Sequence, residues 1–223
     1  MFDLLKAIYI EKFLHTLVSF MIQSAWGDLM TTVDLSIPYR KVLMVLPKKR
    51  VGSEHKLKEG FHYEKYTDDL FDAWCSLQTG VKLFETKEQA AGKLKEMLAE
   101  DRAFFEENFL FVMDEKGNLA ASAGLWPGRD FDEPRLRIHY VATDPSFQHN
   151  GLARSMLTKL AVKYDTLKTK YPLYLATQAQ SYGAIRLYAS IGFTPYLGAY
   201  NGHTQEQSGQ DWEETTKILR EYA

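Results

Sequence analysis

Gln148-His149-Asn150-Gly151-Leu152-Ala153 is the stretch that decides the fold, because a strand pattern changes into a helix pattern there. Residues 135–141 alternate as a strand does, and apolar residues from about 151 to 170 recur at helical spacing. The first turn of a helix leaves backbone N–H groups unpaired and carries about half a positive charge. Gly151 and Ala153 let a bulky anion approach that backbone. The stretch therefore predicts an anion site or, as the plainer alternative, an ordinary helix start.

The chain after this helix predicts a further strand and helix. An apolar run at 173–177 predicts the strand, Ser181 is placed to cap a helix over 182–190, and Gly192 is placed to end it. The strand–helix–strand crossover over 136–177 predicts a parallel pair of strands. The expected order is completed by a strand over 193–199, a polar loop over 201–210 and a helix over 212–222.

The chain before the loop predicts a mixture of strands and helices. Thr86 and Gln89 have the spacing of a capping box, so a helix is expected from there to about 105. Pro127-Gly128 is expected to break the second strand of a hairpin. The other expected elements are strands at 42–46, 61–66, 109–113 and 119–125, a helix from about 68 to 78, and a solvated loop at 48–60. This order indicates a mixed α/β fold.

Two blocks of the chain resemble the GCN5-related N-acetyltransferase (GNAT) superfamily. Gln148 to Ala153 matches its acyl-CoA loop, R/Q-x-x-G-x-G/A, and Ala184-Ile-Arg-Leu-Tyr188-Ala-Ser-Ile-Gly192-Phe193 is similar to its A-I-x-L-Y-x-x-x-G-F block. The resemblance covers roughly residues 60–200. It implies a twisted mixed sheet of about six to seven strands flanked by helices. The expected organisation is a helical extension over 1–29 and one acyl-CoA N-acyltransferase domain over 30–223.

The resemblance also implies where the cofactor, acetyl-CoA, would bind. Backbone groups of Val141, Ala142 and Thr143 would pair with the pantetheine arm. The pyrophosphate would be held by the loop, that is by Gln148, His149, Asn150, Gly151, Leu152 and Ala153. Ser181 stands where many members have Asn; it could bond the cofactor, but its side chain reaches less far than that of Asn. No metal is expected.

Tyr188 aligns with the tyrosine that protonates the departing thiolate of CoA in many members of this superfamily. A phenol suits that task, because its pKa of about 10 keeps it protonated at neutral pH. Without the surrounding block, a tyrosine packed on an amphipathic helix would be the simpler interpretation. The resemblance therefore implies that Tyr188 is the general acid.

His139 is the candidate general base, because some members carry a His or Glu on the strand that leads to the loop. Its ordinary pKa, near 6.5, suits a base at neutral pH, although a single histidine is often structural. Asp130, Asp132 and Glu133 lie in a loop between two strands and could steer a cationic amine toward the site. A solvated acidic loop is the alternative interpretation.

The composition excludes several other classes of protein. The chain has 223 residues, 45% of them apolar, and a formal charge of −2, which gives no reason to expect a nucleic-acid partner. Its single cysteine, Cys75, excludes an internal disulfide and fits a reducing compartment. The apolar run at 13–22 is about half of what a bilayer span requires. A cytoplasmic protein that does not bind membranes is expected, with a homodimer as one arrangement.

Two functions from different classes fit these observations. The first is an N-acetyltransferase that moves an acetyl group from acetyl-CoA to a primary amine of a small molecule or peptide, by direct attack in a ternary complex. The second is a non-catalytic acyl-CoA sensor or scaffold. Nucleotide binding through a phosphate-binding loop is not supported, since no G-x-x-x-x-G-K-[S/T] occurs.

Overall fold

The computed structural model describes residues 33–222, so the helical extension expected over 1–29 lies outside the described residues. Within them, seven strands form one mixed sheet in the order β2-β3-β4-β5-β6-β1-β7. The strands are β1 (Lys41–Leu46), β2 (Phe61–Glu64), β3 (Phe109–Asp114), β4 (Leu119–Gly128), β5 (Arg135–Thr143), β6 (Leu173–Gln178) and β7 (Thr194–Pro195). The α-helices are α2 (Phe71–Gly80), α3 (Lys87–Asn108), α4 (Leu152–Thr166), α5 (Tyr182–Ile191) and α6 (Gln205–Glu221). The predicted fold class is confirmed.

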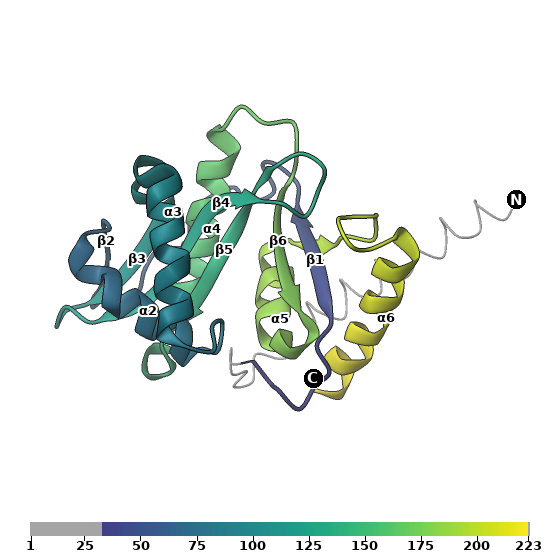
Figure 1. Cartoon of the computed structure of the whole chain (residues 1–223), viewed down its shortest axis with the longest axis horizontal. Helices are drawn as coiled ribbons and strands as arrows, with labels where there is room; N and C mark the ends of the chain where they lie inside the picture. Colours follow the sequence, from purple (N-terminus) through teal and green to yellow (C-terminus); the bar gives the residue numbers. More distant parts are fainter. Residues whose placement is uncertain (1–32, 223) are drawn as a thin grey trace, which may run out of the picture.

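The helices cover both faces of the sheet, because the inner strands carry apolar side chains on both faces. On one face, Trp74, Leu94 and Phe105 of α2 and α3 pack against the aromatic side chains of β3 and β4. On the other face, α4, α5 and α6 pack against β1 and the small residues of β4. Figure 1 shows α2 and α3 in front of the sheet and α4 behind it. No helix within residues 33–222 is long and apolar enough to cross a membrane.

Strand β1 occupies an inner position of the sheet. It pairs antiparallel with β6 along its whole length and with β7 on its other edge, and Leu43 and Met44 are fully buried. Figure 1 shows β1 beside β6, although about 130 residues separate the two strands in the chain. The apolar run at 42–46 predicted a strand there, but its position between β6 and β7 depends on contacts with the far end of the chain.

Four predicted boundaries were wrong, two of them for identifiable reasons. Strand β4 continues through Pro127 because β3 pairs with β4 only as far as Gly124, and proline is tolerated where no partner needs its missing N–H. Helix α6 begins at Gln205 instead of 212, since Thr204 and Gln207 form a capping box that the sequence analysis missed. Strand β7 ends at Pro195 instead of 199, and α4 ends at Thr166 instead of 170.

The predicted alternation along β5 is interrupted by a β-bulge. Gly124 pairs with His139 and Ser122 pairs with Ala142, so one residue of β4 stands opposite two residues of β5. At the bulge, Tyr140 has φ 51°, in the left-handed region that costs an aromatic residue about 1–3 kcal/mol. As a result, the rings of His139 and Tyr140 lie only 5.2 Å apart instead of on opposite faces. The bulge therefore resets the direction of every β5 residue after it.

Candidate active site

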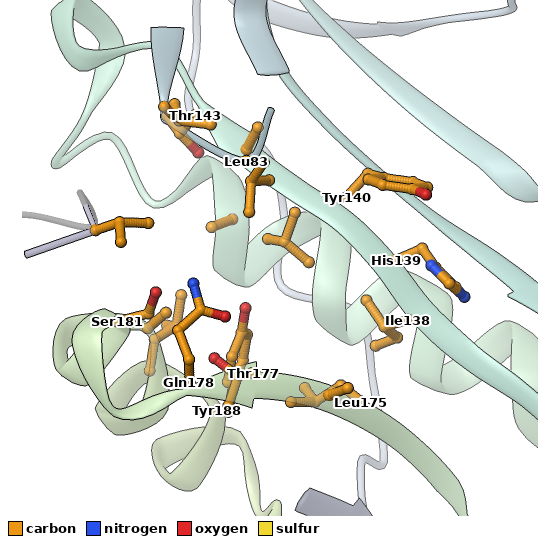
Figure 2. Close-up of a pocket in the computed structure, with 18 of the residues that line it drawn as sticks. Leu83, Ile138, His139, Tyr140, Thr143, Leu175, Thr177, Gln178, Ser181 and Tyr188 are labelled. Carbon is orange, nitrogen blue, oxygen red and sulfur yellow. The ribbon is translucent and has the colours of Figure 1, made fainter. Parts of the chain in front are cut away.

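The candidate site is a cleft between β5 and β6. Within the described chain these parallel strands pair only at Arg137–Tyr174 and Ile138–Leu175, after which they separate. The cleft between them has a volume of about 180 Å³. Tyr188 of α5 lines it from one face of the sheet, and Val81 and Leu83, which follow α2, line it from the other. The cleft is thus reached by side chains from both faces of the sheet, as Figure 2 shows for Leu83 and Tyr188.

The structure brings some of the predicted site residues together in this cleft and leaves others in the adjoining loop. The cleft is lined by His139, Val141, Ala142, Thr143, Ala153, Ser181 and Tyr188. The loop residues Gln148 to Leu152 do not line it. Thr143 Oγ1 is buried and has no hydrogen-bond partner within residues 33–222. Beyond Ile138, β5 therefore presents a hydroxyl and a strand edge to the cleft.

The loop from Gln148 to Gly151 is held in an open curve by its own polar groups. The Asn150 side chain donates hydrogen bonds to the carbonyls of Phe147 (3.0 Å) and Gln148 (3.2 Å). His149 and Gly151 have φ 63° and 73°, and Ser155 N donates to the Gly151 carbonyl at the start of α4. The backbone N–H groups of residues 149–153 therefore lie before the first hydrogen bond of the helix. The buried Gln148 Nε2 also has no partner in the described chain. Free backbone N–H groups at a helix start are what an anion site requires.

Lys58 is a basic residue at this loop that the sequence analysis missed. Its Nζ donates to Asn150 Oδ1 (2.7 Å), while His55 N donates to Thr158 Oγ1 (2.9 Å). The Ser155 hydroxyl also donates to the carbonyl of Lys56 (3.0 Å). Residues 48–60 form an irregular and largely exposed loop, as predicted, but its second half also lies on the first turns of α4. No local pattern indicates this contact, because it depends on the sheet bringing the two segments together.

Ser181 lines the cleft but does not cap α5 with its side chain, contrary to the prediction. The residues Ala179–Ser181 form a 3-10 turn, η3, that continues directly into α5. Ser181 has φ −102° and ψ 45° instead of the extended conformation of a capping residue. Its hydroxyl group therefore remains available to the cleft.

Tyr188 reaches the cleft from the middle of α5. Figure 2 shows its side chain pointing from the helix into the space between β5 and β6. It is only 7% exposed, and burial raises its pKa far above the usual value. No group within residues 33–222 forms a hydrogen bond with its hydroxyl. The phenol therefore keeps its proton throughout the neutral and moderately alkaline range.

His139 lies farther along the cleft and is closely held. Figure 2 shows it next to Tyr140, away from Ser181 and Gln178. Arg137 Nε donates to His139 Nε2 (2.7 Å), and the backbone of Pro127 forms a hydrogen bond with the same ring. Burial, and then the charges of Arg137 and Lys93, hold the pKa of His139 well below 6.5. The imidazole is therefore neutral at physiological pH, and its Nε2 already accepts a hydrogen bond from Arg137.

Asp130 is buried beneath this end of the cleft. Its carboxylate accepts hydrogen bonds from Lys41 Nζ (2.6 Å), Arg137 Nη1 (2.5 Å) and Tyr174 Oη (3.1 Å). Burial alone would raise its pKa, but Arg137, Lys41 and Tyr174 together outweigh that effect and lower it. Asp132 and Glu133 line a second cavity, of about 360 Å³, elsewhere on the molecule. None of the three acids expected to steer an amine lines the cleft. Asp130 instead holds the side chain of Arg137 in place.

Comparisons with known proteins agree with this architecture. The model of the acetyltransferase (GNAT) family matches residues 63–193. The fold is similar to a GCN5-related N-acetyltransferase from Sphaerobacter thermophilus, with 17% identity and a TM-score of 0.53, over 72% of this chain and 50% of that one. It is also similar to a tandem GNAT protein from the clavulanic acid biosynthesis pathway, with 13% identity and a TM-score of 0.51, over 72% of this chain and 51% of that one.

The chain thus spans about half the length of these solved structures, and at such low identities the likeness concerns the fold. None of the curated proteins matches the sequence. The family match, in contrast, covers more than half of the 223 residues and includes β5, the loop at 148–151 and α5. The chain belongs to the GNAT family of acetyltransferases.

Proposed function

We propose that this protein transfers an acetyl group from acetyl-CoA to a primary amine by direct attack in a ternary complex. The observation that carries the proposal is the cleft lined from both faces of the sheet, with a proton-bearing Tyr188 pointing into it. Acetyl donor and amine would approach from opposite faces and meet between β5 and β6. The working unit would be a single domain over residues 30–223.

The residues of the cleft and of the adjoining loop fit CoA. The free edge of β5 at residues 141–143, with the unpartnered Thr143 hydroxyl, suits the amide-containing pantetheine arm. The N–H groups of residues 149–153 and the buried Gln148 Nε2 suit the pyrophosphate. Ser181 can add a hydroxyl contact. When bound, acetyl-CoA supplies a thioester that an amine can attack.

The chain supplies three further elements of the chemistry. N–H groups of β5 after the bulge would stabilise the negative charge that develops on the carbonyl oxygen. Tyr188 would give its proton to the departing sulfur. His139 is the candidate that accepts the proton of the amine. For that, its Nε2 must exchange the hydrogen bond from Arg137 for the substrate, because one lone pair cannot serve both.

Replacement of His139 by Gln tests this assignment, since an amide side chain can still contact Arg137. If His139 is the base, kcat should fall at least about tenfold at neutral pH, while the affinity for CoA stays within twofold. Rates and CoA binding would be measured from pH 5.5 to 9. An unchanged kcat would show that water takes the proton and that His139 only packs against Arg137.

Lys58→Ala tests the anion loop. Because this exposed ammonium group lies on Asn150, its loss should weaken CoA binding by about fivefold, corresponding to about 1 kcal/mol. The binding should also become less sensitive to salt, since one screened charge is gone. Titration calorimetry at low and high salt measures both effects. Lys116→Ala, in the turn between β3 and β4, is the matched control and should change neither.

The alternative function is a sensor that binds acyl-CoA without transferring the acyl group. An acceptor screen monitored by release of free thiol separates the two functions when CoA binding is measured in parallel. Transfer to at least one small-molecule or peptide amine supports the enzyme. Tight CoA binding with no thiol release from any amine would support the sensor and reject the proposed reaction.

A further inference from the structure

Gln78, in the last turn of α2, is a fully buried polar residue that touches both strands at the bulge. Its Nε2 donates to Ser122 Oγ of β4 (3.0 Å) and to the Tyr140 carbonyl of β5 (3.2 Å). A carbonyl can only accept, so the amide orientation is fixed by this second contact. The side chain therefore joins a helix to the two strands on either side of the irregularity.

The bulge creates a need for such a donor. Where two residues of β5 stand opposite one of β4, the extra residue leaves the ladder and its carbonyl loses a strand partner. A buried carbonyl without a partner is unfavourable, and Tyr140 also adopts a left-handed φ of 51°. The Gln78 amide supplies the missing hydrogen bond. Leu77 and Val81, on either side in sequence, pack on Ala142 and hold the helix end against β5.

The side-chain amide of Gln78 is not an efficient way to stabilise the fold. Its Oε1 is buried and has no partner within residues 33–222, and burying an amide oxygen in this way is unfavourable. An apolar side chain of the same length would avoid that loss. The environment of Gln78 thus indicates that this residue maintains the conformation of the bulge more than it adds to overall stability.

We propose that Gln78 is a positioning residue that fixes the bulge at Tyr140 and so directs the backbone of residues 141–143 into the cleft. The proposal rests on the proposed function in that CoA is taken as the ligand of this backbone. A strand has a period of two, so loss of the bulge would turn every N–H and C=O after it to the opposite side. The edge that faces the cleft would then point away from it.

The test compares Gln78→Met with Ser122→Ala. The first variant removes the hydrogen bond to the Tyr140 carbonyl, whereas the second removes only the bond to Ser122 and keeps the bulge contact. We expect Gln78→Met to weaken CoA binding about tenfold or more, since the backbone hydrogen bonds of residues 141–143 to the cofactor would be lost. Ser122→Ala should change the affinity less than twofold. Calorimetry gives the affinities, and thermal unfolding of the same samples gives the stability loss.

Two outcomes would overturn the proposal. One is a CoA affinity of Gln78→Met within twofold of wild type. The other is that both variants lose affinity in proportion to their loss of thermal stability. Amide hydrogen exchange at residues 141–143 reads the bulge without any ligand, and it should be faster in Gln78→Met than in Ser122→Ala. If wild type bound no CoA, the proposed function would fail, whereas this exchange difference would still decide the role of Gln78.

Gln78→Glu provides a variant of nearly the same shape if Gln78→Met does not fold. A neutral carboxyl group can donate to the Tyr140 carbonyl, whereas an ionised one cannot, and burial raises the pKa of a carboxyl group. Relative to wild type at the same pH, CoA binding should be within about threefold at pH 5.5 and at least about tenfold weaker at pH 9. A ratio that does not change with pH would contradict the proposal.

Discussion

Tyr188→Phe is expected to lower kcat for acetyl transfer about a hundredfold while leaving the affinity for CoA within twofold. A positioned general acid typically contributes about 10²–10⁴ to the rate, and phenylalanine keeps the ring that packs near Phe193. Because no described group hydrogen-bonds the hydroxyl, its removal should not weaken the fold. Thiol release under saturating substrates measures kcat, and calorimetry measures CoA binding.

Tyr182→Phe is the matched control for this experiment. Tyr182 lies on the same helix, stacks on Tyr222 and does not line the cleft, so its hydroxyl should be dispensable for transfer. Because burial raises the pKa of Tyr188, the wild-type rate should show no loss from Tyr188 ionisation below about pH 10. A kcat for Tyr188→Phe within threefold of wild type would remove Tyr188 from the mechanism.

Asp130→Ala is expected to reduce the free energy of unfolding by about 3–5 kcal/mol, the usual cost of removing one partner of a buried ion pair. The Asp130 side chain is 6% exposed and neutralises both Lys41 and Arg137, which would remain without their shared partner. Denaturant unfolding measures the loss. Asp132→Ala, in the same loop but on the surface, is the control and should stay within about 0.5 kcal/mol of wild type.

The same variant has a predictable pH dependence. The pKa of Asp130 is lowered in the folded state, so its contribution is fully present above the unfolded value of about 3.9. It should be lost as the pH falls through the lower folded-state pKa. The stability difference between wild type and Asp130→Ala should therefore be constant from pH 5 to 8 and shrink below about pH 4. A difference that grew on acidification would contradict the ion-pair explanation.

Asp130 also shows how a local pattern can mislead. Three acids in one loop suggested an exposed surface for a cationic amine, yet the structure separates them. Asp130 turns inward because Lys41 of β1 and Arg137 of β5 converge on it, and these residues come from distant parts of the chain. Asp132 and Glu133 remain at the second cavity. An acidic residue in a loop is expected to be exposed only when no buried cation is close enough to pair with it.

Features that depend on neighbours in the chain were determined by the sequence alone. Gly151 marks the start of α4, and the block around Tyr188 defines α5 and the glycine that ends it. The capping box of Thr86 and Gln89 was also predicted correctly. These signals are local, because a cap or a helical stripe is formed by residues within a few positions of one another. The family resemblance rested on such segments.

Features that join distant segments were decided only by the tertiary structure. The bulge at Tyr140, its contact with Gln78 and the approach of Lys58 to Asn150 each bring together residues far apart in sequence. The position of β1 between β6 and β7 is of the same kind. The periodicity of apolar residues indicates which face of a helix or strand is buried. It does not indicate which other element packs against that face, or where a strand contains a bulge. The loop at 148–151 and the helix start after it could therefore be predicted from the sequence, whereas packing decided which way the backbone of β5 faces before that loop.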